Sequence, residues 1–151
     1  MESEMILRPH HLIDILRDYG KGRAFAPHPY GHAVHTVAER IRANLDTEIT
    51  FVIGADSICV PCIHLQPDGS CDDVLAQLDP TISKQGYNDA LDARVFETLG
   101  LMPGCGMTAR AFFQVVAAHM PAIAAVCTHP GEDPAARLSG VRDGLRVLGL
   151  A

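Results

Sequence analysis

The sequence has no tryptophan, and aromatic residues make up only 5% of its 151 positions. It also lacks any apolar run near the roughly 20 residues that a membrane-spanning helix needs. Its first residues, Met-Glu-Ser-Glu, do not carry the positive charge that opens a signal peptide. Basic side chains are few, with 12 Lys and Arg against 18 Asp and Glu, whereas nucleic acids and anionic membranes select basic surfaces. We therefore expect a cytoplasmic protein that binds neither nucleic acid nor membrane.

An even set of cysteines is also missing, because the chain has five. An odd number without an export signal argues against a disulfide framework, and predicts thiols that are buried, reactive or bound to metal. Hydrophobic residues make up 48% of the chain and charged residues 20%, which excludes a disordered, strongly charged chain. The length is that of one ordinary domain, so we predict a single domain over residues 1–151.

Helical patterns dominate the sequence. Apolar residues at helical spacing predict a helix over residues 11–19 that ends at Gly20. The other helices are predicted over residues 29–45, 83–99, 109–119 and 134–148, with a shorter one between Pro121 and Cys127. One segment, residues 48–53, has the β-branched, alternating composition of a strand. The predicted class is α+β and mainly helical, with five or six helices and one short strand or small hairpin near residues 48–65.

Three of the five cysteines lie close together after the predicted strand. Cys59 and Cys62 are separated by two residues, and Cys71 follows a Pro-Asp-Gly turn. Such turns can aim three thiolates at one point, and thiolates bind zinc at about 2.3 Å or hold iron–sulfur clusters. Two other interpretations are open, namely three buried thiols or a redox-active pair. A redox pair normally opens a helix, whereas this pair follows a strand, so the metal site is the preferred hypothesis.

A fourth metal ligand has to come from elsewhere in the chain. Arg8, His10 and His11 stand together at the start of the first predicted helix, and Asp14 lies one turn after His10. Residues four apart on a helix can face one point, so His10 and Asp14 are candidate ligands. His11 is the third candidate, and because consecutive helical residues point about 100° apart, only one of the two histidines is expected to bind the metal. His64 lies nearer to the cysteines but is expected to cap or to face solvent. In an alternative interpretation the thiols are incidental, and Arg8, His10 and His11 line a pocket where Arg8 binds a carboxylate or phosphate.

A second histidine group is spaced like one face of a helix, with His28, His32 and His35 at intervals of four and three. Pro29 argues against a continuous helix there, so we predict an exposed polar face rather than a metal site. The roles of Cys105 and Cys127 are not indicated. No Ser/His/Asp order and no His-Glu-x-x-His motif is present, so no catalytic residue is predicted, and the question of enzymatic activity is left open.

The chain resembles a family of bacterial and archaeal proteins through several motifs in the same order. These are Leu-Arg-Pro-His-His at residues 7–11, Gly-Lys-Gly at 20–22, Ile-Cys-x-x-Cys at 58–62 with Cys71, and Leu-Asp-x-Arg-Val-Phe-x-x-Leu-Gly-Leu at 91–101. The family has about this length and no established function, and its members are suggested to be iron–sulfur proteins. The resemblance implies an iron–sulfur cluster, with zinc as the alternative, and a role in electron transfer or cluster carriage with a redox protein partner.

The chain is a divergent member by this resemblance. Family members tend to carry a cysteine where this chain has Asp14, and many have a second cysteine group near the C-terminus where this chain has only Cys127. Three cysteines plus a carboxylate or imidazole can still bind zinc or a more labile cluster. The sequence does not distinguish a monomer from a homodimer.

Overall fold

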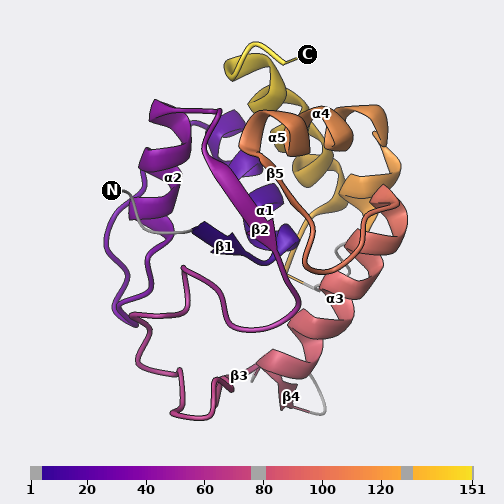
Figure 1. Cartoon of the computed structure of the whole chain (residues 1–151). Coiled ribbons are helices and arrows are strands. Elements are labelled where there is room, and N and C mark those ends of the chain that lie inside the picture. Colours follow the sequence, from indigo (N-terminus) through magenta and orange to yellow (C-terminus); the bar gives the residue numbers. More distant parts are fainter. Residues whose placement is uncertain (1–4, 76–80, 127–130, 151) are drawn as a thin grey trace.

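The computed structural model describes residues 5–75, 81–126 and 131–150 (Figure 1). Within these ranges it has five α-helices and a short 3₁₀ helix: α1 (Pro9–Gly20), α2 (Val34–Ala43), α3 (Lys84–Leu99), α4 (Ala109–Ala118), η1 (Ala122–Ala125) and α5 (Pro134–Val147). The predicted α+β, mainly helical class is confirmed. None of the helices in the described part of the chain combines the length and the apolar character that crossing a membrane would need.

Three helix boundaries follow from the local signals that predicted them. The Thr108 hydroxyl accepts a hydrogen bond from the Ala111 N–H at the start of α4, and the Asp133 carboxylate accepts one from the Ala135 N–H at the start of α5. Gly100 ends α3 in the left-handed conformation, at a φ of 68°. These caps make the boundaries predictable from a few neighbouring residues.

The second helix begins later than predicted. It starts at Val34 rather than at Pro29, because residues 28–31 form a turn in which the Gly31 N–H donates to the His28 carbonyl over 2.8 Å. Gly31 has a φ of 77°, which an L side chain rarely adopts. The predicted helix after Pro121 is the 3₁₀ helix η1, and Cys127 lies outside the described residues.

Two strands of the main sheet were not predicted. The sheet has the order β1 (Met5–Leu7), β2 (Glu48–Phe51) and β5 (Gly106–Thr108), with β1 parallel and β5 antiparallel to β2. The second sheet pairs β3 (Val74–Leu75) with β4 (Ile82–Ser83). Strands of two or three residues are too short to show an alternating pattern, so the sequence alone does not indicate them.

Close packing against α5 fixes the position of α1 (Figure 1). The helices approach at glycines, since a Cβ on Gly20 would lie 1.9 Å from the Gly140 carbonyl oxygen and one on Gly144 would lie 2.1 Å from that of Leu16. At the other end, Arg8 is the N-cap residue of α1 and directly follows β1. The segment that carries Arg8, His10 and His11 is therefore held by the sheet on one side and by helix packing on the other.

Candidate functional site

The loop after β2, residues 54–73, brings the three clustered cysteines to one cavity. Within this cysteine loop the Cys62 N–H donates to the Cys59 carbonyl over 2.9 Å, and Cys71 pairs with Leu65 in an isolated antiparallel bridge. The Cys71 N–H also donates to the Gln85 side-chain oxygen of α3 over 2.8 Å. Cys59, Cys62 and Cys71 all line a cavity of about 70 Å³, which we call the cysteine pocket. Other residues that line it include Arg8, His11, Tyr30, His32 and Lys84.

The three cysteines that line the cysteine pocket are free, half-buried thiols. Among the described residues, no group of three or more His, Cys, Asp or Glu side chains is arranged so that it could hold a metal ion as it stands. Burial, together with the negative charge of Asp56, raises the pKa of Cys59 to about 12. Cys59 is thus a neutral thiol at pH 7, and a metal ion that binds it has to displace its proton.

Asp56 is a buried acceptor that links Arg8, His11 and Cys59. Its carboxylate accepts hydrogen bonds from the backbone N–H groups of Arg8, Ile58 and Cys59 over 2.8, 3.0 and 3.1 Å. It also lies 2.7 Å from Nδ1 of His11. Burial on its own would raise the pKa of Asp56, but the charge of His11 and these hydrogen bonds outweigh it and hold the pKa at about 2. The ionised carboxylate therefore ties the start of α1 to the cysteine loop.

His11 is oriented by this carboxylate. An ionised carboxylate can only accept, so Nδ1 of His11 is the donor and Nε2 is the ring nitrogen left for a ligand. Burial lowers the pKa of His11, but the Asp56 charge outweighs it and the pKa is raised. The same carboxylate–imidazole pair commonly orients histidines that bind metals. Of the predicted fourth ligands, His11 is the one that lines the cysteine pocket.

His10 has a similar partner but borders a different cavity. Its Nδ1 and its backbone N–H lie 2.8 and 3.0 Å from Oδ1 of Asp92, a fully buried residue of α3. The rings of His10 and His11 are 4.4 Å apart. Successive helical residues point about 100° apart. His10 does not line the cysteine pocket but lines a neighbouring cavity of about 280 Å³, which His11 also borders. We call this second space, which Asp14, Arg17, Lys84, Glu132 and Arg137 also line, the polar cavity.

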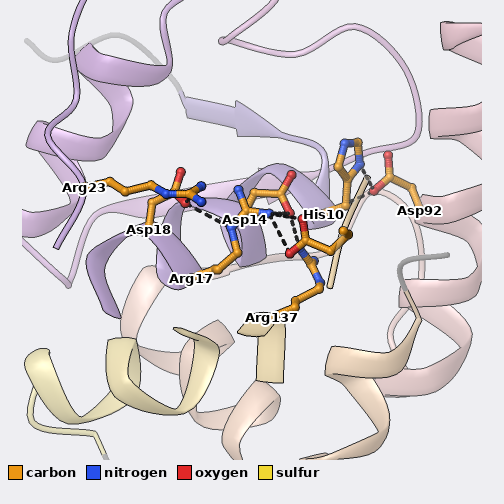
Figure 2. A network of polar contacts seen from close by, with 8 residues as sticks. His10, Asp14, Arg17, Asp18, Arg23, Asp92 and Arg137 are labelled. Carbon is orange, nitrogen blue, oxygen red and sulfur yellow. Dashed lines mark hydrogen bonds and ion pairs between the residues drawn. The ribbon is translucent and has the colours of Figure 1, made fainter. Parts of the chain in front are cut away.

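Asp14 is also placed at the polar cavity and not at the cysteine pocket. Its carboxylate accepts a hydrogen bond from Nη1 of Arg137 over 2.8 Å, and Figure 2 shows the two side chains meeting between α1 and α5. Burial opposes ionisation, but Arg137 outweighs it and lowers the pKa of Asp14. The spacing of four residues does bring His10 and Asp14 to one cavity, although the cysteines do not share it. His64, the local competitor, lies 2.8 Å from Asp72 through its Nδ1.

Arg8 is buried and already paired with carboxylates. Its Nη1 lies 2.9 Å from Asp92 and 2.8 Å from Asp89. Burial would lower the pKa of Arg8, but these carboxylates outweigh it and raise the pKa. The predicted role of Arg8 as a grip for a ligand anion is thus not favoured by its surroundings. Arg8 instead connects the partners of both histidines, since its N–H binds Asp56 and its side chain binds Asp92.

Three residues of this region were missed or misjudged from the sequence. His32 lines the cysteine pocket, where its ring stacks on His28 at 4.2 Å. It is half-buried rather than exposed, and its Nδ1 is buried with no hydrogen-bond partner in the described part of the chain. Asp92 lies among the buried residues of α3. An acidic residue at such a position in the sequence indicates a buried carboxylate. Asp56 carries only the weaker signal of an acid in a turn.

Comparisons with known proteins give one match. A family model described as "Protein of unknown function (DUF1284)" matches residues 28–129, which is more than half of the chain. The matched range contains the three clustered cysteines together with Asp56 and Asp92, and begins after His11. No curated protein and no solved structure matches the chain significantly.

Proposed function

This chain belongs to the family described as "Protein of unknown function (DUF1284)", and we propose from its own site that it binds a metal centre in the cysteine pocket. The proposed ligands are the thiolates of Cys59, Cys62 and Cys71 and the Nε2 atom of His11. The observation that carries the proposal is that these four side chains, from the cysteine loop and from α1, line one cavity. A cysteine-rich cavity with one oriented imidazole is an ordinary set of metal donors.

The surroundings of the four side chains suit this role. Asp56 binds both the His11 ring and the Cys59 backbone, so the two proposed ligands share one rigid support. The other two thiols belong to the cysteine loop, where Cys62 follows a turn and Cys71 lies in the bridge with Leu65, and both are half-buried, as Cys59 is. Since no described group is arranged for an ion as it stands, binding requires the thiols to lose their protons and to rotate toward the centre of the pocket.

Two kinds of centre are compatible with three thiolates and one imidazole. An iron–sulfur cluster is the first candidate, because the motifs of the chain resemble those of proteins suggested to hold one, and because histidine can replace cysteine as a cluster ligand. The implied role is electron transfer or cluster carriage with a redox protein partner. A single zinc ion is the second candidate, which the His11–Asp56 pair favours, since such carboxylate–histidine pairs are typical of zinc sites.

Elemental analysis of protein purified without oxygen separates these candidates. A brown protein with iron and acid-labile sulfide identifies the cluster, whereas a colourless protein with one zinc per chain identifies the second candidate. Cys59→Ala and Cys71→Ala are expected to lose the metal. Cys105→Ala is the matched control, because Cys105 packs against the core and does not line the cysteine pocket. Full metal content in both Cys59→Ala and Cys71→Ala would contradict the proposal.

The fourth ligand can be tested in the same way. His11→Ala is expected to lower the metal content, or to change the visible spectrum if a cluster is bound. His32→Ala tests the other imidazole of the cysteine pocket. His119→Ala serves as the control, because the His119 ring bonds the Val115 carbonyl of its own helix. If only His32→Ala has an effect, His32 rather than His11 completes the centre.

A further inference from the structure

The polar cavity has the size and lining of a second ligand site. It lies beside the cysteine pocket, and His11, Lys84 and Asn88 line both spaces. Its volume of about 280 Å³ is near the lower end of the range of small-molecule sites. The proposed metal centre makes no use of this space.

Three cations gather around the polar cavity, although the chain as a whole is acidic. The whole chain carries a net charge of -6. The polar cavity is lined by the cations Arg17, Lys84 and Arg137 and by the carboxylates of Asp14 and Glu132. Each cation has a carboxylate partner, since Arg17 and Arg137 contact Asp14 and Glu132 and Lys84 lies 3.2 Å from Asp73. Cations gathered in a concave, partly desolvated site attract an anion more strongly than they would on an open surface.

Arg137 is the most buried of these cations. The residue is 3% exposed, and its Nη1 donates to Asp14 over 2.8 Å. Its Nε is buried and has no hydrogen-bond acceptor among the described residues. A buried guanidinium with an unused donor is uncommon in folded proteins. Arginine is also the side chain that suits carboxylate and phosphate oxygens best.

Acceptors are mixed with the cations in the same lining. Asp14 and Glu132 are carboxylates, and His10 has its Nδ1 on Asp92, which leaves Nε2 as an acceptor when the ring is neutral. An oxyanion without protons would be repelled by the carboxylates. An oxyanion that carries a hydroxyl group can donate to them while its other oxygens face the cations.

We propose that the polar cavity binds a phosphate group that retains a hydroxyl, either as inorganic phosphate or as the singly protonated end of a small phosphomonoester. The phosphate oxygens would face Arg137 and Lys84, and the hydroxyl would face Asp14 or His10. This proposal stands without the metal centre, because its phosphate contacts are Arg137, Lys84, Asp14 and His10, and none of the proposed metal ligands except His11 lines the polar cavity.

Calorimetric titration of the full chain tests the proposal. The probes are inorganic phosphate, glycerol 3-phosphate and sulfate, at pH 6 and at one ionic strength. Inorganic phosphate is expected to bind with saturation, and sulfate, which has no hydroxyl, at least about tenfold more weakly. Stronger binding of glycerol 3-phosphate than of inorganic phosphate would identify an ester as the ligand, and the reverse would identify free phosphate. Equal binding of sulfate and phosphate, or no saturable binding of phosphate, would overturn the proposal.

Variants locate the binding in the polar cavity. Lys84→Ala, at a half-exposed position, is expected to weaken phosphate binding about fivefold or more. Asp14→Asn is expected to reduce the preference for phosphate over sulfate, because it removes a negative charge. Arg142→Ala, on the exposed side of α5, is the control and should bind as wild type does. Unchanged binding in Lys84→Ala would place any bound phosphate elsewhere and overturn the assignment.

The metal centre and the phosphate site can fail separately. Cys71→Ala is expected to lose metal and to keep phosphate binding. Asp14→Asn, at a residue that lines the polar cavity and not the cysteine pocket, should keep the metal and lose the preference for phosphate over sulfate. Loss of phosphate binding in Cys71→Ala would contradict the independence of the two sites.

Discussion

The interface between α1 and α5 and the cysteine loop both border the candidate sites, but they are built in opposite ways. In the interface, backbones meet at Gly20, Gly140 and Gly144 with no room for a Cβ. In the cysteine loop several residues are exposed, and the large apolar residues Val60 and Ile63 are 70% and 68% exposed. Close backbone contact stabilises a fold, whereas a loop with few buried contacts can change its side-chain arrangement at low cost.

The two regions therefore have different roles: one holds the candidate sites in place, and the other supplies binding groups. The interface positions α1, and through it His10 and His11, while the cysteine loop carries the thiols. Changes in the interface should therefore act on the stability of the whole fold, and changes in the loop on ligand binding alone. Asp56 is the exception that tests the distinction, because it lies in the loop but is buried like a core residue, at 2% exposed.

The largest effect is expected from Gly144→Ala. The added Cβ would lie 2.1 Å from the Leu16 carbonyl oxygen, so the two helices would have to move apart. We expect the free energy of unfolding to fall by about 3 kcal/mol or more, as measured by chemical denaturation of the metal-free protein. Gly86→Ala is the control, since a Cβ there meets nothing closer than 3.8 Å and should change stability by less than about 1 kcal/mol, toward higher stability. Equal losses in the two variants would contradict the role of the close contact.

Asp56→Asn should have the second largest effect. An amide carries no charge and can accept fewer of the hydrogen bonds that Arg8, Cys59 and His11 direct at this position. We expect a loss of about 2–3 kcal/mol in the free energy of unfolding, together with weaker metal binding. Asp72→Asn, at an exposed position of the same loop, should cost less than about 0.5 kcal/mol. A similar, small loss in both variants would show that Asp56 behaves as an ordinary loop residue.

The helices could be predicted because their signals are local. Thr108, Gly100 and Asp133 cap elements whose apolar residues repeat within a few positions, and the structure places helix ends at them. Strands β1 and β5 could not be predicted, because each exists through its pairing with β2. The turn at residues 28–31 overrides the proline signal for a helix start, which is why α2 is shorter than expected.

The candidate site divides in the same way. The Cys-x-x-Cys spacing and the turn before Cys71 indicate that the thiols meet, and the three residues line one pocket. It could not be predicted that His11 reaches the cysteine pocket and His10 does not, because this depends on carboxylates that are distant in sequence. Their partners Asp92 and Asp56 lie 82 and 45 positions away. Only the folded chain shows which ring faces which cavity.

A smaller loss in the free energy of unfolding is expected at low pH. The pKa of Asp56 is lowered from 3.8 to about 2 in the folded protein, so its ionised form stabilises the fold above about pH 4. That contribution is lost as the pH falls through the folded-state pKa, and it amounts to about 2 kcal/mol. We expect metal-free wild type to lose up to this amount more than Asp56→Asn between pH 4 and pH 2, as measured by denaturation at the two pH values. Parallel losses in the two proteins would show that Asp56 has no special environment.

The smallest effect on stability is expected from Cys62→Ser. Cys62 is a half-buried free thiol on a turn of the cysteine loop, and serine fits the same space with little change in volume. We expect the free energy of unfolding of the metal-free protein to change by less than about 1 kcal/mol, while the metal content falls to a small fraction of that of wild type. This result would show that the Cys62 sulfur is needed for metal binding and not for folding. A large loss of stability in the metal-free protein would instead mean that the Cys62 side chain contributes to packing. The cysteine loop would then resemble the α1–α5 interface in its contribution to stability.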